Sequence, residues 1–176
     1  MTATQQRKQR DWPTRWRHLW LDESDAKWLL GPNGLERLTE KVAASERHHR
    51  GEIRVCIEAA LPVRHLLVGR SARARALQLF NSLGVGRTRE RNGVLIYLLQ
   101  ADRAIEVIVD PALAAQVDPT QWQRVVDGLQ TQFRAGRFEA GLLEAIDAVD
   151  HLLVAHCPTA PGTLNPNELP NEPLLM

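Results

Sequence analysis

The apolar run from Val94 to Leu99 constrains the fold of this chain more than any other feature of the sequence. An unbroken apolar run of strand length is typical of a strand that is buried on both faces. A second stretch, from Ala104 to Val109, alternates less completely, and a short polar break of hairpin length separates the two. The pattern predicts an antiparallel pair, with a central strand over Gly93–Leu99 and its partner over Ala104–Val109.

The residues before this pair predict a crossover unit. Ile53, Val55 and Ile57 alternate with other side chains, which predicts a strand with at least one apolar face. A helical pattern follows over residues 66–83 and ends at a glycine turn before the central strand. Because crossovers of this kind join parallel strands with a right-handed connection, the strand that begins near Glu52 is expected to lie parallel to the central strand.

Further helices are predicted around this sheet. An apolar helical period is present over residues 35–46, 121–134 and 138–156. A central strand that is apolar on both faces needs cover on both sides. The sequence therefore predicts an α/β fold, a three-layer α/β/α sandwich around a small mixed sheet. This sheet has a parallel β-α-β crossover and an antiparallel hairpin strand, with room for one more short strand.

Length and composition divide the chain into three parts. We expect a basic, tryptophan-rich helical extension over residues 1–21, an α/β domain over 22–157 and a disordered proline-rich tail over 158–176. The net charge of +1 provides no overall electrostatic footprint for nucleic acid. No apolar run reaches the ~20 residues of a transmembrane helix. With two cysteines and no signal-peptide pattern, the expected location is the cytoplasm.

The N-terminal extension has two interpretations. Trp12, Trp16 and Trp20 recur every four residues, which places them along one helical face, and basic residues crowd the same segment. One interpretation is a basic amphipathic helix that contacts a membrane surface or a protein partner. The other is a helix docked on its own domain, with arginine stems covering the tryptophan rings. Aromatic stripes usually belong to a core, which favours the second interpretation.

Few residues are candidates for chemistry, and no catalytic residue can be named. The serines lack the sequence context of a nucleophile motif. His48 and His49 are adjacent, and adjacent helical residues point about 100° apart, which disfavours a metal pair. Carboxylates near the ends of predicted elements suit either an oxygen-rich calcium or magnesium site or a solvated rim. These carboxylates belong to Asp25, Glu46, Glu52, Glu58, Asp102, Asp110 and Asp118.

A basic cluster marks the crossover helix and the turn before it. Such a cluster could bind an anion, but it more often forms the solvated face of a helix. We therefore expect its last three arginines to point mostly outward. The cluster comprises Arg64, His65, Arg70, Arg73 and Arg75.

Four short motifs resemble those of the TPM domain family. Residues 45–55, SERHHRGEIRV, resemble the family's E-x-x-T-x-G-E-I-x-V segment, and residues 92–96 match its N-G-V-L-I core strand. Asp102-Arg103 matches the D-R of its hairpin, and residues 136–142, GRFEAGL, resemble the link between its last helices. The motifs follow the family order over about residues 22–158. The chain is similar to bacterial TPM-domain proteins and to the thylakoid lumen proteins of photosystem II repair.

The resemblance implies an α/β/α sandwich with a small mixed sheet. It also implies the weak acid phosphatase activity and divalent-metal binding, often of calcium, that are ascribed to some members. By position it implies Asp25, Asn92, Asp110 and Asp118 as metal-site residues, with calcium or magnesium as the ion. Where many members carry a glycine-rich G-x-G-[LI]-E loop, this chain has DPALA at residues 110–114. A carboxylate is thereby replaced by a methyl group, and proline stiffens the loop.

Two functions remain from this comparison. The favoured one is a cytoplasmic binding or scaffolding module without robust catalysis, because the loop is altered, no nucleophile is recognisable and the N-terminal helix is a candidate contact. The alternative is a divalent-metal-dependent phosphohydrolase, in which Asp25, Asp110 and Asp118 hold a hard cation that polarises a phosphate. The substrate and the partner are unknown from the sequence.

Overall fold

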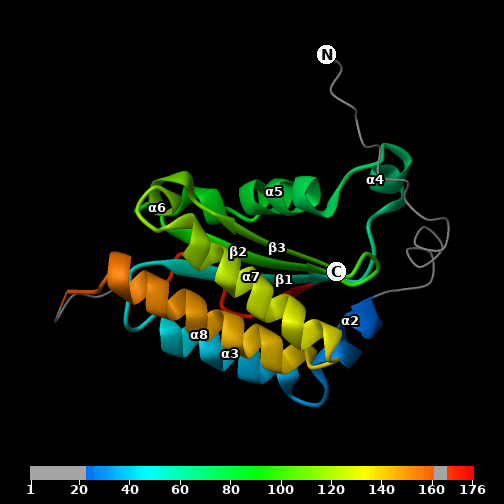
Figure 1. Ribbon diagram of the computed structural model, residues 1–176, viewed down its shortest axis with the longest axis horizontal. Helices are drawn as coiled ribbons and strands as arrows, with labels where there is room; N and C mark the ends of the chain where they lie inside the picture. Colours follow the sequence, from blue (N-terminus) through cyan, green and yellow to red (C-terminus); the bar gives the residue numbers. More distant parts are fainter. Residues whose placement is uncertain (1–22, 161–165) are drawn as a thin grey trace.

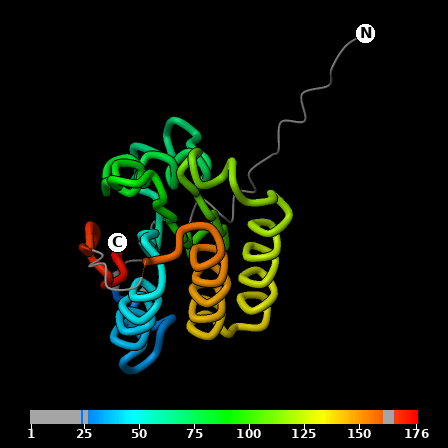
Figure 2. The backbone as a smooth tube through the Cα atoms, turned by 90° about the vertical axis from the view of Figure 1, so that its left-hand side faces the viewer, coloured from blue at the N-terminus to red at the C-terminus, as the bar shows by residue number. Residues whose placement is uncertain are grey.

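The computed structural model describes residues 23–160 and 166–176, and these form three layers (Figure 1). A sheet lies in the middle, with helices on both of its faces, as the tube in Figure 2 also shows. The predicted α/β/α sandwich is therefore confirmed. The predicted tryptophan-rich helix over residues 1–21 lies outside the described residues.

The sheet has four strands in the order β3-β2-β1-β4. β1 (Glu52–Glu58) pairs in parallel with β2 (Gly93–Leu99), and β3 (Ala104–Val109) pairs with β2 in the antiparallel direction. β4 (Leu174–Leu175) adds to the other edge of β1 in parallel, with Cys56 opposite Leu174. The predicted parallel crossover and hairpin are confirmed, and β4 is the additional short strand.

The helices divide between the two faces of the sheet. One face is covered by α2 (Glu23–Leu30), α3 (Gly34–Ser45), α7 (Pro119–Arg134) and α8 (Phe138–His156). The other face is covered by α4 (Val63–Leu67), α5 (Ala72–Ser82) and the 3-10 turn η1 (Val85–Arg87). The four-residue helix α6 (Pro111–Ala114) follows β3 directly.

All seven residues of β2 are buried, because alternate side chains enter two separate cores. Val94, Ile96 and Leu98 pack in the core beneath α3, α7 and α8. Leu95, Tyr97 and Leu99 pack in the core beneath α5. The unbroken apolar run is thus explained by a central strand between two helical layers.

The helix predicted over residues 66–83 is two helices. Gly69 has a φ of 63°, in the left-handed region that ends a helix, and α4 stops before it. The Ser71 hydroxyl then accepts a hydrogen bond from the Ala74 amide at 3.2 Å and begins α5. The prediction of one continuous helix was wrong because it followed the apolar spacing across a glycine that interrupts the backbone.

The C-terminal segment, residues 166–176, packs along β1 and ends in β4. Leu169 is buried, and Leu174 and Met176 pack against the α5 core. The expectation of a disordered tail therefore does not hold over these residues. Within the described ranges, no helix combines the length and the apolar character that crossing a membrane requires.

Candidate functional site

Two of the four residues predicted as metal ligands, Asn92 and Asp110, lie at the same end of the sheet. Asn92 precedes β2, and Asp110 follows β3. The Asp110 amide donates to the Gly93 carbonyl at 2.9 Å, so Asn92 and Asp110 lie at one end of the sheet. Asp118 is exposed and caps the start of α7. The helix α2, which carries Asp25, lies at the opposite end of the sheet from α6 (Figure 1).

Both carboxylate oxygens of Asp110 are engaged by the protein itself. Asp110 is fully buried, and its Oδ1 accepts a hydrogen bond from the Ala112 amide at 2.9 Å, which caps α6. Its Oδ2 accepts from Nε of Arg91 at 2.8 Å. Arg91 has a φ of 56°, an uncommon left-handed conformation for a residue with a side chain. The charge of Asp110 is thus balanced by an arginine, and its hydrogen-bonding capacity holds the altered loop.

Asn92 presents one buried oxygen without a hydrogen-bond partner at this end of the sheet. Its Nδ2 donates to the Arg50 carbonyl at 2.6 Å, whereas its Oδ1 is buried and unpaired in the described structure. Calcium takes six to eight oxygen ligands, and magnesium prefers octahedral oxygen coordination. The described residues contain no group of three His, Cys, Asp or Glu side chains placed to hold a metal. The Asn92 amide oxygen and the Asp110 carboxylate, which Arg91 already engages, supply fewer oxygens than either ion takes.

A buried ion pair beneath α5 was missed by the sequence analysis. Glu58 is 2% exposed, and its carboxylate accepts from Nε and Nη2 of Arg75 at 2.8–3.1 Å and from the Tyr97 hydroxyl at 2.6 Å. The expectation that Arg75 points outward was therefore wrong. Burial raises the pKa of the neighbouring Cys56 thiol to about 12, which keeps it protonated and unreactive. The cluster fixes α5 on the sheet and leaves no activated nucleophile there.

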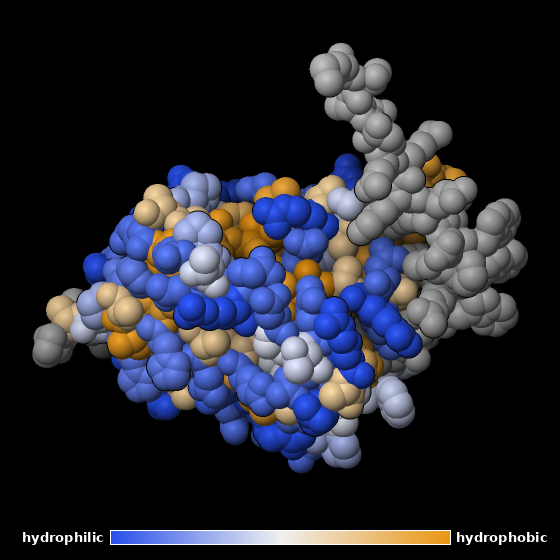
Figure 3. Space-filling view, in the orientation of Figure 1, coloured by the Kyte–Doolittle hydropathy of each residue, from blue (hydrophilic) through white to orange (hydrophobic). Residues whose placement is uncertain are grey.

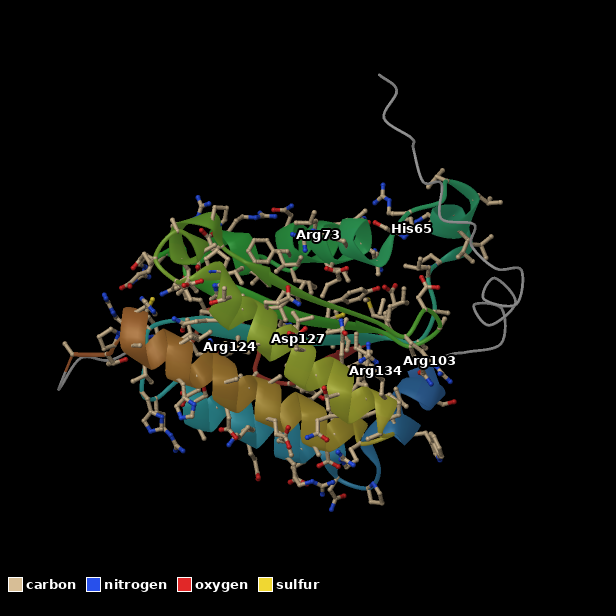
Figure 4. All side chains as sticks on the ribbon, viewed as in Figure 1. His65, Arg73, Arg103, Arg124, Asp127 and Arg134 are labelled. Carbon is tan, nitrogen blue, oxygen red and sulfur yellow. The ribbon has the colours of Figure 1, made fainter. Side chains whose placement is uncertain are left out.

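The other arginines of the crossover lie on the outside. Figure 4 shows Arg73 on α5, where its Nη1 lies 3.1 Å from the Glu106 carboxylate of β3. Its side chain is 63% exposed. This residue belongs to a solvated helix face, as the sequence predicted.

Ser45, His49 and Asp150 contain the side-chain types of a hydrolase triad in a different arrangement. The Ser45 hydroxyl donates to Oδ1 of Asp150 at 2.9 Å, and the same Oγ lies 2.8 Å from Nε2 of His49. A catalytic carboxylate holds the histidine through the nitrogen that faces away from the serine. Here Asp150 contacts the serine itself, and Ser45 is 5% exposed. The trio links α3 to α8 and does not assemble a nucleophile.

Two carboxylates predicted at element ends face the C-terminal segment. Glu46 accepts at Oε1 from the Ile53 amide at 3.0 Å, and the Asn171 amide group lies 3.0 Å from its Oε2. Burial raises the pKa of Glu46 to about 8. Glu52 is 1% exposed, and burial also raises its pKa. These acids belong to the interior contacts of the molecule, not to a solvated rim.

The short helix α4 exposes a group of aliphatic side chains. Val63, Leu67 and Val68 are 57%, 76% and 71% exposed, while Leu66 and His65 on the same helix are buried. Figure 4 marks α4 by His65, at the end of the sheet opposite α6, and Figure 3 shows apolar atoms at this corner. We call Val63, Leu67 and Val68 the α4 patch. The sequence signal for this patch was the aliphatic content of residues 63–68. It was missed because the predicted helix began only at Leu66.

The comparison with known families agrees with this architecture. The family model described as the TPM domain matches residues 24–152, which is more than half of the chain. The chain belongs to the TPM domain family. The family match of this TPM domain ends before the C-terminal segment, so residues 166–176 lie outside it.

Solved structures have the same fold. The BA42 protein of the psychrophilic bacterium Bizionia argentinensis, an NMR structure, is 25% identical with a TM-score of 0.71. That alignment covers 81% of this TPM domain chain and 92% of the BA42 chain. The N-terminal domain of a P. gingivalis protein is 21% identical with a TM-score of 0.58, over 78% of this chain and 90% of that one. A search of curated proteins gave no match.

Proposed function

We propose that this TPM domain is a binding module without robust catalysis and that the α4 patch contacts a protein partner. The observation that carries the proposal is the exposure of Val63 and Leu67 on α4 and of Val68 at its C-cap. Apolar side chains grouped in this way on a surface mark an interaction site more often than isolated ones do. The proposal locates the module's contact surface on α4.

The surroundings of the patch favour a protein over a membrane. Arg64 is exposed and Arg70 is half-buried, and both lie within a few residues of the α4 patch in the sequence, which favours an apolar centre with basic neighbours. This pattern complements a partner surface with an apolar centre and acidic rim. Helices that lie in a membrane interface usually present a long apolar face, whereas α4 spans Val63–Leu67 only.

The state of the polar groups supports the absence of robust catalysis. The Asp110 carboxylate is engaged by Arg91 and by the α6 cap, and the Glu58 carboxylate is engaged by Arg75 and Tyr97. A general base or a metal ligand needs an oxygen that is free to contact the reacting group. These carboxylates are instead committed to holding the fold.

The test compares two surface substitutions in affinity capture. Leu67→Glu places a charge in the α4 patch, whereas Leu77→Glu places one at an exposed leucine of α5, which is 43% exposed. We expect a bound protein that the wild type and Leu77→Glu retain and that Leu67→Glu loses. Equal capture by both variants contradicts the proposal. Co-sedimentation of the wild type with phosphatidylglycerol vesicles, lost in Leu67→Glu, would assign the patch to a membrane.

The N-terminal segment is tested separately. Trp12, Trp16 and Trp20 lie outside the described residues, and the chain enters the domain from this segment at α2. Deleting residues 1–21 while the core stays folded is expected to weaken capture if the segment adds to the same contact. Unchanged capture would confine the contact to the folded domain.

The alternative function, a metal-dependent phosphohydrolase, is favoured by one observation, the unpaired Oδ1 of Asn92. Calcium and magnesium titrations followed by amide NMR shifts test it directly. Saturable shifts around Asn92 and Asp110, with metal-dependent hydrolysis of a generic phosphomonoester that is lost in Asp110→Ala, would replace the binding module. Flat spectra and metal-independent background in both proteins would support the binding module.

A further inference from the structure

The C-terminal segment, residues 166–176, lies along the edge of β1 and is held there from two directions. Its last residues extend the sheet: the Met176 amide donates to the Ile57 carbonyl at 3.0 Å, and the Ala59 amide donates to the Met176 carbonyl at 2.7 Å. Figure 2 shows this segment, in red, beside the body of the domain. We call this location the β1-edge site, made of the β1 backbone from Cys56 to Ala59 and the side chains of Glu46, Glu52 and Arg54.

Two charged side chains of β1 recognise the main chain of the segment. The Glu52 carboxylate accepts from the amides of Glu168 at 3.3 Å and Leu169 at 3.1 Å. Nη1 of Arg54 donates to the carbonyl of Pro170 at 2.7 Å and to the carbonyl of Glu172. Because these are contacts to backbone groups, they recognise an extended chain without reading its side chains.

The prolines of the segment explain why side chains of β1, and not its backbone, bind the main chain of the segment. Pro170 and Pro173 have no amide hydrogen, so the segment cannot form a continuous ladder with β1. Strand pairing is accordingly confined to Leu174 and Leu175. Upstream of them, Glu52 and Arg54 satisfy the amides and carbonyls that a ladder would have paired.

Apolar side chains of the segment provide the specific part of the contact. Leu169 is 8% exposed and enters the α5 core, which Leu174 and Met176 also contact. Leu175 packs on the opposite core. The β1-edge site therefore takes an extended segment with a leucine before a proline and two more leucines farther along.

The rest of the domain has the layers of a complete sandwich without this segment. The family match ends at residue 152, and β1, β2 and β3 already form a sheet covered on both faces. Glu52 and Arg54 are 1% and 7% exposed, and both depend on the segment's backbone for hydrogen bonds. Charged groups at a sheet edge are hydrated again when a bound peptide leaves. Charged groups in a permanent core would stay buried without a partner, which costs much more free energy.

We propose that the β1 edge is a peptide-docking site, that the C-terminal segment occupies it in cis, and that an extended segment of a partner protein with the same leucine–proline chemistry displaces it. Strand addition to an exposed sheet edge is a recurring mode of peptide recognition. The tethered segment competes at an effective concentration of roughly millimolar, so the partner must bind tighter or the segment must be released.

The experiment releases the segment by cutting its tether. A protease site replaces residues 161–165 in the full chain, and the probe is a fluorescein-labelled synthetic peptide of residues 166–176. After cleavage we expect saturable uptake of the probe that unlabelled peptide competes away. The uncleaved protein should take up the probe at least about a hundredfold more weakly, because the tethered segment stays in place.

Two arginine variants make the test specific to the β1 edge. Arg54→Met removes the donor to the Pro170 and Glu172 carbonyls and should weaken probe binding at least about tenfold. Arg73→Met removes an exposed arginine of α5 and should leave binding unchanged. A peptide with Leu169→Ser and Leu174→Ser should fail to compete.

Four results would overturn the proposal. The cleaved protein could keep its circular dichroism spectrum and refuse the probe, or unfold when the segment leaves, which would make the segment part of the core. Equal binding by Arg54→Met and Arg73→Met would exclude the proposed backbone contacts. Dimers of the uncleaved chain that exchange segments would make a second copy the occupant. The cleaved Leu67→Glu variant should still bind the probe. The experiment can therefore refute the β1-edge site without refuting the α4 contact, and the reverse.

Discussion

Glu46 should make the protein less stable as the pH rises from about 4.5 to about 8. Glu46 is 8% exposed, and loss of hydration raises its pKa to about 8 from an ordinary value of 4.5. The hydrogen bond from the Ile53 amide opposes this shift without cancelling it. Between the two pKa values the folded chain holds a proton that the unfolded chain has released, so the free energy of unfolding falls with pH. The contribution is complete below 4.5 and lost above about 8.

The size of this effect follows from the displacement of the pKa. One pKa unit corresponds to about 1.4 kcal/mol, so a change from 4.5 to about 8 corresponds to at most about 5 kcal/mol. A domain of this kind has a total stability of about 5–15 kcal/mol. Ionisation of this one carboxyl would therefore remove a large share of it.

Urea unfolding at pH 5 and pH 8.5 measures the effect in the wild type and in Glu46→Gln. Glutamine keeps an acceptor for the Ile53 amide and cannot ionise, so its stability should change much less with pH. The pKa of Glu52 is raised by burial, which acts in the same direction, and burial lowers the pKa of His49, which costs stability as pH falls below 6.5. Both groups remain in both proteins, so the difference reports Glu46.

Glu40→Gln is the matched control, because Glu40 lies on the exposed side of α3, the helix that Glu46 follows as the C-cap. This variant should follow the wild type at both pH values. If Glu46→Gln also follows the wild type, the carboxyl is ionised in the folded protein and the reasoning from burial is refuted.

The other predictions concern stability measured by urea unfolding at one pH. Gly93→Ala places a Cβ 2.1 Å from a backbone carbonyl oxygen of η1 and should lower the free energy of unfolding by about 3 kcal/mol. Gly128→Ala places its Cβ in open space and should raise the free energy of unfolding by about 0.5–1 kcal/mol. Similar stabilities of the two variants would contradict the predicted clash. Arg75→Met leaves the buried Glu58 carboxylate without its ion-pair partner and should cost about 3–5 kcal/mol of stability. A cost below about 1 kcal/mol would contradict the stabilising role of this ion pair. Asp118→Ala removes the cap of α7 and should cost about 1 kcal/mol; no loss would mean that solvent caps the helix equally well.

The central strands were predictable because a strand that is buried on both faces consists almost entirely of apolar residues. Gly93–Leu99 and Ala104–Val109 have the predicted bounds. β1 was more difficult, because its apolar residues alternate with charged ones although all seven are buried. Its charged face is covered by α5 and by the C-terminal segment. Neither neighbour is local in the sequence, so periodicity alone could not reveal the cover.

The C-terminal segment shows a second limit of composition. Its prolines and lack of basic residues are typical of disorder, but proline is compatible with an extended chain at a sheet edge. The signal that mattered was the spacing of Leu169, Leu174 and Met176, which anchor the segment. The candidate metal residues were implied by the family resemblance, and only the structure could separate the end of the sheet that holds Asp110 from the end that holds α2.

Because Cys56 of β1 pairs with Leu174 of β4, the sheet cannot form all four strands until the C-terminal segment has been synthesised. β1 is made early, but the strand that covers its outer edge leaves the ribosome much later. Until then the nascent chain carries an uncovered strand edge, the kind of surface on which chains associate wrongly. The side chains of Glu52 and Arg54, charged and then solvated, would face that exposed edge. The residues that later hold the segment would thus also act as gatekeepers against aggregation while the chain is unfinished.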